Sequence, residues 1–345
     1  MKRSAITIIF CSLIFTINAQ TISIDDRSSN ISFNHLDLGI TLGTTGIGIE
    51  ASTPICDIAQ LRAGFAFMPH INYDMNFDIQ VGDDPSQSHS KFEKLSGFLE
   101  QLTGNKVNES VIMEGHPSYN NVKLLIDVFP FRNKHWHLTA GFFYGKSEIA
   151  SAINSMEDMQ SLTAVNIYNN IYNKAYRDYY IDFTPIIIYG GKEVYLDPDM
   201  EEKILSYGRM GIHIGDYKNY FKDKVDKDGN VVLDEEGNTI KVPVNYIMEP
   251  DINSIVKARI KTNKFKPYIG FGYGGNLSKY SDKYKIIFDC GLMFWGGTPD
   301  VLTHDGTNLT KDLVNVRGKV GTYVNIINKF KAFPVIDLRI TKRLF

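Results

Sequence analysis

The residues best suited to chemistry in this sequence lack the spacing of a known catalytic or metal site. His135 and His137 flank Trp136, and strand alternation would place both imidazoles on the face opposite the indole. Neither the HExxH nor the CxxC spacing occurs among the histidines and cysteines. We therefore expect no catalytic residue and no metal site in this chain.

A calcium loop and a phosphate loop are also disfavoured. An EF-hand loop starting at Asp226 would need Gly at its sixth position and Glu at its twelfth, where Val231 and Gly237 stand. The segment 226–230 (DKDGN) is better interpreted as a turn at Asp228-Gly229. Two glycine clusters, at 39–48 and 270–275, neither open a helix nor carry a Walker lysine, so we expect no cofactor.

The remaining chemical candidates are charges that occur singly on the polar face of alternating segments. They are Glu50, Arg62, Asp127, Arg259, Asp289, Asp337 and Arg339. Their signs nearly balance, and unpaired charges in a narrow interior are costly, so we expect them to pair. Two interpretations stay open, a salt-bridged plug and a narrow ion path. The plug is favoured because side chains usually fill the interior of an eight-stranded barrel.

Nine segments carry the period-two alternation that would position these charges. They are 35–43, 46–54, 61–68, 122–128, 136–144, 256–261, 265–274, 286–294 and 334–345. One face of each is apolar and often aromatic, whereas the other carries glycine and isolated charges. A soluble sandwich buries its large apolar residues between two sheets, but a closed transmembrane barrel turns them toward lipid. We expect an all-β, closed antiparallel transmembrane barrel, with a secreted sandwich as the alternative.

Short and long connections separate these segments in the manner of bacterial outer-membrane barrels. Long insertions occur at about 72–120, 148–253 and 296–332, and apolar residues at helical spacing predict helices over 90–102, 151–180 and 311–330. Nine strands cannot close an antiparallel barrel with an even number. Either 35–54 is one bent strand, giving eight, or a tenth lies near 208–217. With that count of eight, the long loops would share the side of the C-terminus.

The N-terminus predicts export. Lys2 and Arg3 precede an apolar run, 5–17, which ends at Asn18-Ala19-Gln20. This is the pattern of a secretory signal peptide over 1–20, leaving 21–345 as a single barrel domain with structured insertions. Of the cysteines beyond it, Cys56 and Cys290, each is expected to be a small buried side chain, and the sequence leaves open whether they pair.

Several motifs together resemble a known group of proteins. They are LGTTGIGIE (42–50), LRAGF (61–65), DVFPF (127–131), HLTAGFFYG (137–145), KPYIGFGYGG (266–275), FDCGLMFWGGTP (288–299) and PVIDLRITKRLF (334–345). The chain resembles small, uncharacterised outer-membrane β-barrels of Bacteroides-type Gram-negative bacteria, similar to OmpA in barrel size. The resemblance brings no catalytic residues. The terminal Phe345 resembles the signal by which the barrel assembly machinery captures a last strand.

These observations favour a non-enzymatic, monomeric barrel in the outer membrane. Its role would be structural, envelope-anchoring or surface-recognising, in contact with outer-membrane lipid and lipopolysaccharide. A formal net charge of -2 provides no basic surface for nucleic acid. A barrel enzyme acting on lipid A or lipopolysaccharide, and a narrow channel, remain as alternatives.

Overall fold

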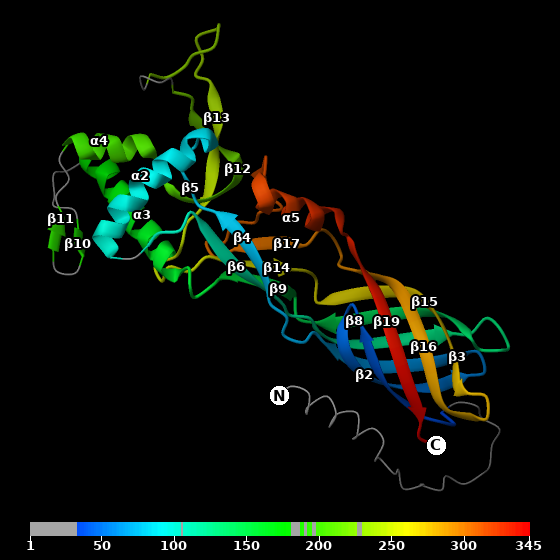
Figure 1. Cartoon of the computed structure of the whole chain (residues 1–345). Coiled ribbons are helices and arrows are strands. Elements are labelled where there is room, and N and C mark those ends of the chain that lie inside the picture. Colours follow the sequence, from blue (N-terminus) through cyan, green and yellow to red (C-terminus); the bar gives the residue numbers. More distant parts are fainter. Residues whose placement is uncertain (1–32, 105, 181–186, 190–191, 195–197, 226–229) are drawn as a thin grey trace.

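A computed structural model describes residues 33–104, 106–180, 187–189, 192–194, 198–225 and 230–345. The predicted signal peptide, 1–20, and the predicted turn at Asp228-Gly229 lie outside the described residues. The molecule has two parts, a barrel and a cap that stands on one end of it (Figure 1). The cap is formed by the three long connections, 68–119, 146–264 and 295–331.

Eight antiparallel strands close the barrel, as the alternation predicts. In chain order they are β1 (Asp37–Gly43), β2 (Gly46–Cys56), β3 (Ala59–Phe67), β7 (Asn120–Val128), β8 (Trp136–Gly145), β15 (Phe265–Ser278), β16 (Ser281–Phe294) and β19 (Ala332–Arg343). The ring closes because β1 pairs with both β2 and β19, with Ile40 opposite Ile49 on one side and Ile340 on the other. Closure leaves no barrel strand with an unpaired edge.

One of the nine alternating segments, 256–261, belongs to the cap, and this resolves the odd number of predicted barrel strands. It forms β14 (Lys257–Lys261), which pairs with β9 (Glu148–Asn154) and β17 (Asp300–Thr303). The segment 35–54 is two strands, β1 and β2, and not one bent strand. The suggested tenth strand near 208–217 lies in β12 (Met210–Asp223), which is also in the cap. Alternation indicates a strand but not the sheet that contains it, because pairing is set by distant residues.

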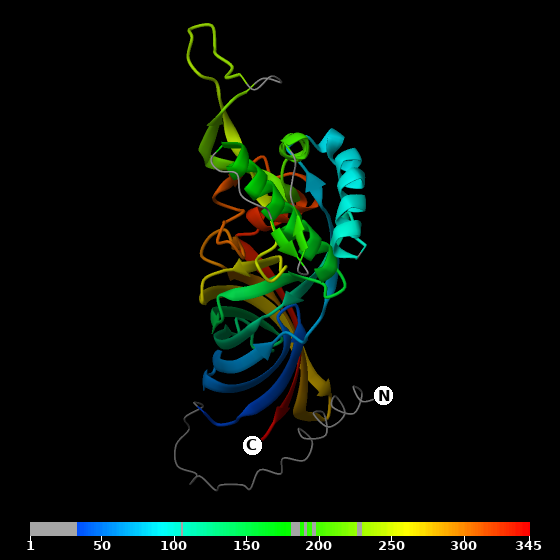
Figure 2. The same cartoon turned by 90° about the vertical axis from the view of Figure 1, so that its left-hand side faces the viewer.

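The correct eight strands also reverse the predicted position of the long loops. The connections at 57–58, 129–135 and 279–280 lie at the barrel end where β1 begins and β19 ends, which we call the turn side. The three long connections lie at the opposite end, the cap side (Figures 1 and 2). This is the usual asymmetry of outer-membrane barrels, with short turns beside the termini.

In the part of the chain that the structure describes, the cap contains two larger sheets, a two-stranded pair and four helices. Its five-stranded sheet has the order β17-β14-β9-β6-β4, where β4 is Tyr73–Asp78 and β6 is Ser110–Pro117. The second sheet has the order β13-β12-β18, with β13 at Lys241–Met248, β18 at Leu313–Val314, and β5 (Gln80–Val81) paired with β12. The helices are α2 (Pro85–Thr103), α3 (Met159–Tyr180), α4 (Pro198–Tyr207) and α5 (Gly318–Lys329). A separate hairpin joins β10 (Ile187–Tyr189) to β11 (Lys192–Val194).

Local sequence explains the helix boundaries. The carboxylate of Asp84 accepts a hydrogen bond from the Ser86 amide at 2.9 Å, and Pro85 begins α2. Gly104 ends that helix at a φ of 75°, a left-handed conformation that glycine adopts without strain. The helix predicted over 151–180 begins only at Met159, because its first residues pair as the end of β9.

Apolar side chains cover the outside of the barrel. Those exposed there are Leu42, Ile49, Phe65, Phe67, Val122, Leu124, Ile126, Val128, Trp136, Leu138, Tyr144, Phe265, Ile269, Phe271, Tyr273, Ile286, Phe288, Leu292, Phe294, Ile336, Leu338 and Ile340. A surface of this extent is an interaction surface, and its band-like form on a closed barrel is that of a lipid-facing wall. Among the described helices, none is long and apolar enough to cross a bilayer.

The two cysteines among the described residues, Cys56 and Cys290, are free, and only Cys290 is partly shielded from solvent. Cys56 is exposed, which corrects the expectation that it is buried, because it is the last residue of β2 and lies beside a turn. Cys290 is half-buried in β16.

Candidate functional site in the barrel lumen

A layer of paired charges fills the middle of the barrel. This ion-pair layer consists of Glu50, Arg62, Lys123, Asp127, Asp289 and Arg339, all of them buried. Three cations therefore face three carboxylates inside the ring of strands. Each side chain projects inward because it alternates with a lipid-facing neighbour on the same strand.

Arg62 joins opposite walls of the barrel. Its Nη2 lies 2.8 Å from Asp127 Oδ1 on the neighbouring strand β7. Its Nη1 lies 3.0 Å from Asp289 Oδ2 on β16, which is four strands away around the ring of eight. The guanidinium therefore crosses the lumen, and its planar fork suits two carboxylates at once.

Arg339 and Lys123 complete the layer around Glu50. Arg339 Nε lies 3.1 Å from Glu50 Oε1 and 3.3 Å from Asp289 Oδ2. Lys123 Nζ lies 2.6 Å from Glu50 Oε2. Glu50 has room to accept both cations because Gly64 stands beside it, and a Cβ at Gly64 would lie 2.7 Å from the Glu50 Cβ.

His137 extends the layer toward the turn side. Its Nε2 lies 2.7 Å from Asp289 Oδ1, across Gly272, which pairs with both residues in the ladder. A Cβ at Gly272 would lie 2.6 Å from Asp289 Oδ1, so a larger residue there would displace the carboxylate. Glycine on the inner face thus permits this contact between side chains.

The structure places six of the seven charges singled out by sequence inside the barrel. Asp337 is buried there beside Thr45, whose hydroxyl donates to Asp337 Oδ1 at 3.4 Å. Arg259 is the correction: it lies in β14, opposite Ser151 and Leu302, and is part of the cap. Sequence reasoning also omitted Lys123 and His137 from the site. Both lie on the polar parity of their strands, so the alternation of Lys123 with Asp127 could have identified the lysine.

A second, apolar layer seals the lumen on the cap side. It consists of Leu125, Phe143, Tyr268, Met293 and Val335, which are buried together with Tyr119 and Trp295. Phe143 and Tyr268 meet edge to face, with ring centroids 5.4 Å apart. The sequence signal is a break in alternation, since LLI (124–126), FF (142–143) and LMF (292–294) place apolar residues on both faces.

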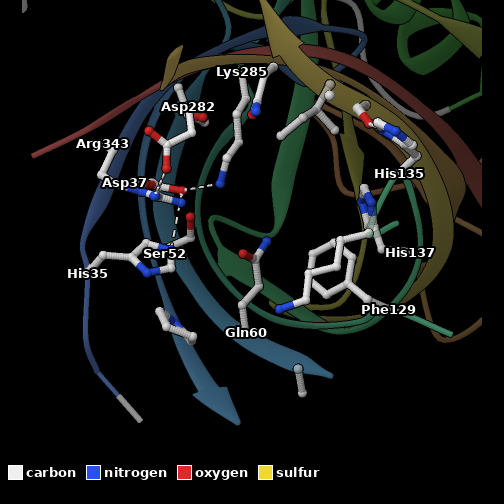
Figure 3. A pocket seen from close by; sticks show the side chains of 18 of the residues that line it. His35, Asp37, Ser52, Gln60, Phe129, His135, His137, Asp282, Lys285 and Arg343 are labelled. Atoms are coloured by element: carbon white, nitrogen blue, oxygen red, sulfur yellow. Dashed lines mark hydrogen bonds and ion pairs between the residues drawn. The ribbon is translucent and has the colours of Figure 1, made fainter. Parts of the chain in front are cut away.

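The turn side of the lumen is open. A polar vestibule of about 290 Å³ begins at His35, Asp282 and Arg343 and ends at His137 and Arg339. Figure 3 shows Asp37, Lys285 and Arg343 on one wall and His135, His137 and Phe129 on the other. Lys285 Nζ lies 3.0 Å from Asp37 Oδ2. The Arg343 guanidinium pairs with Asp282. Water can therefore approach the ion-pair layer from one side.

Comparisons with known proteins yield structures only. No protein-family model matches the chain, and no curated protein matches it. Among solved structures, Acinetobacter baumannii CarO2 matches at 14% identity over 90% of this chain and 98% of that one, with a TM-score of 0.36. CarO of the same organism matches at 13% identity over 92% and 99%, with a TM-score of 0.35. A major outer membrane protein from Thermus thermophilus matches at 9% identity over 90% and 98%, with a TM-score of 0.26.

TM-scores this low carry no structural argument, and the barrel fold follows from the strand pairing alone. Among the described residues, no group of three or more histidine, cysteine, aspartate or glutamate side chains is arranged to hold a metal ion. The chemical effect of the ion-pair layer is structural. Ion pairs between buried cations and carboxylates connect strands on different sides of the barrel.

Proposed function

We propose that the protein is an outer-membrane barrel that does not conduct and does not catalyse a reaction, and that it presents the cap at the cell surface for recognition. The observation that carries this proposal is the double closure of the lumen, by the ion-pair layer and by the apolar layer behind it. The apolar outer wall and the turn-side termini support insertion with the cap outside. Outer-leaflet lipid and lipopolysaccharide would surround the barrel.

Planar-bilayer recording tests the closed lumen. The purified chain is expected to give no current steps, because charged side chains fill one layer and apolar side chains fill the next. Regular unitary steps would overturn the proposal. A narrow channel is the second candidate, and the open polar vestibule that reaches His137 is the observation that favours it.

Cysteine labelling tests the orientation with a reporter that the chain already contains. Cys56 is exposed on the turn side, and Ile252 is 93% exposed in the cap. A membrane-impermeant maleimide added to intact cells is expected to label an Ile252→Cys variant, with Cys56 reacting only after the outer membrane is opened. Labelling of Cys56 in intact cells and not of the cap cysteine would reverse the orientation.

The enzyme alternative is tested by lipid A mass profiles of cells with and without the gene. Profiles that are the same in both strains are expected, and a mass difference that is restored by the wild-type chain would contradict the non-enzymatic role.

A further inference from the structure

The cap contains a cavity that no barrel strand lines. It has a volume of about 460 Å³ and lies between the five-stranded sheet and helix α5. Closely packed interiors leave few voids larger than a water molecule, and small-molecule sites have volumes of roughly 300–1,000 Å³. The size of this cavity therefore indicates a binding site and not a packing defect.

The floor of the cavity is lowered by small residues in one row of the sheet. Gly115 of β6 pairs with Ala152 of β9, and Ala152 pairs with Ala258 of β14. Since neighbouring strands are about 4.8 Å apart, these three positions form a trough roughly 10 Å long, with the Met75 methyl group over its Gly115 end. The adjacent rows on the same face are larger, with Met113 on one side and Ile260 on the other.

Helix α5 forms the roof. Val320, Tyr323, Val324 and Ile327 line the cavity at helical spacing. The Tyr323 ring packs edge to face on Phe77 of β4, with centroids 6.3 Å apart, and this contact holds the roof beside the sheet. Tyr73 and Tyr323 are both exposed, so the cavity opens to solvent between them.

The charge of the lining restricts the ligand. Among the described residues, no lysine or arginine lines the cavity, and Asp74 borders it on β4, where it alternates with Met75 and Phe77 and its side chain lies on the opposite, exposed face. His116 also borders it, with Nδ1 3.1 Å from Asn72 Oδ1. An anionic head group inside the cavity would have no cation to balance its charge, whereas an uncharged chain would contact mainly apolar side chains.

We propose that this cavity binds one free, uncharged aliphatic molecule with its chain along the trough over Gly115, Ala152 and Ala258. The inference deepens the recognition role of the cap and rests on that proposed function for its biological meaning. Binding itself depends only on the folded cap and not on its orientation in the membrane.

Methionine methyl resonances provide the test, because Met75, Met113 and Met248 line the cavity. The full chain, labelled at the methionine methyl groups and held in lipid nanodiscs, is titrated with 1-decanol. Saturable shifts are expected at these three methyl groups, whereas Met156, which is exposed elsewhere in the cap, is expected to keep its position. Absence of saturable shifts, or equal shifts at Met156, would overturn the inference.

Cavity-filling variants provide the control. Ala152→Leu and Ala258→Leu, singly and together, are expected to abolish the saturable shifts. Ala140→Leu, a matched change on the lipid-facing wall of β8, is expected to leave them unchanged. Ligand-free methyl resonances that keep their wild-type dispersion check that the cap of each variant is folded. Shifts that persist in both single variants and in the double variant would contradict the site.

Two further experiments test the effect of head-group charge on binding and whether the ligand comes from the bilayer. Sodium decanoate is expected to bind more weakly than decanol, and equal affinity would contradict the exclusion of anionic head groups by a cavity without cations. Nanodiscs whose lipids have shorter acyl chains are expected to give the same ligand-free methyl positions; a change with lipid would mean that bilayer chains fill the cavity. If the labelling experiment places the cap inside but decanol still binds, the surface role fails and the site stands.

Discussion

Arg62 Nη1 lies 3.0 Å from Asp289 Oδ2, although the two residues stand on strands at opposite sides of the barrel. Both side chains are buried, so this ion pair crosses the lumen within the packed interior of the barrel. A buried ion pair contributes little to the free energy of unfolding relative to well-packed apolar side chains. Removing one member is costly, because the other charge then stays buried without a counter-charge. The lumen therefore depends on every member of the ion-pair layer being present.

Replacing Arg62 by Met is expected to destabilise the barrel by about 3–5 kcal/mol, because Asp127 and Asp289 each lose a cation in a buried site. The temperature at which the folded form converts to the unfolded form on gels should fall accordingly. Arg259→Met is the matched control, since Arg259 lies in the cap sheet and should change stability by less than about 0.5 kcal/mol. Equal losses in the two variants would contradict the lumen assignment.

Gly272 is expected to tolerate no side chain. Gly272→Ala would place a Cβ 2.6 Å from Asp289 Oδ1, so the His137–Asp289 hydrogen bond must move, at a cost of about 1–3 kcal/mol. Gly97→Ala is the comparison, because no neighbouring atom lies within 4 Å of that Cβ and the helix should gain up to about 1 kcal/mol. Chemical denaturation of both variants measures the difference; a neutral Gly272→Ala would show that the inner face is not closely packed.

The cap is expected to lose stability in acid through Asp305. Burial disfavours the Asp305 charge, but hydrogen bonds from the Thr303 hydroxyl, the Thr307 amide and the Tyr246 hydroxyl outweigh burial and hold its pKa below the ordinary value. A depressed folded pKa gives stability that is present above the unfolded pKa and is lost as pH falls through the folded pKa. Because the group is partly solvated, the contribution is about 1 kcal/mol.

Calorimetry of the Asp305→Asn variant measures this linkage. The variant should be less stable than wild type at neutral pH, and the gap should close as pH falls below the ordinary aspartate pKa. A gap that stays constant with pH would mean that Asp305 acts through packing and not through its charge.

The two layers of the lumen are expected to act as independent barriers. Arg62→Ala with Arg339→Ala opens the ion-pair layer but leaves Phe143 and Met293 in place, so no current is expected. Phe143→Ala with Met293→Ala opens the apolar layer and leaves the ion-pair layer in place, and again no current is expected. The four changes together should produce conductance in planar bilayers. Current in either double variant would show that a single layer closes the barrel.

The sequence predicts the eight barrel strands, their inward charges and their lipid-facing residues because each depends on local alternation. It does not reveal that β14 leaves the barrel, since Val256–Lys261 alternates as well as any barrel strand and only its partners β9 and β17 distinguish it. This is why alternation alone assigns Arg259 to the lumen. The cavity in the cap could not be predicted, because Gly115, Ala152 and Ala258 become neighbours only through long-range register.

Heat-modifiable migration on SDS gels tests whether this chain is a closed barrel inserted in the outer membrane. Protein from the outer-membrane fraction, run on an SDS gel without boiling, should migrate faster than the same sample after boiling, because eight paired strands stay closed in detergent until heated. If boiled and unboiled protein migrate alike and the protein fractionates as soluble, the chain is not a closed barrel in the outer membrane.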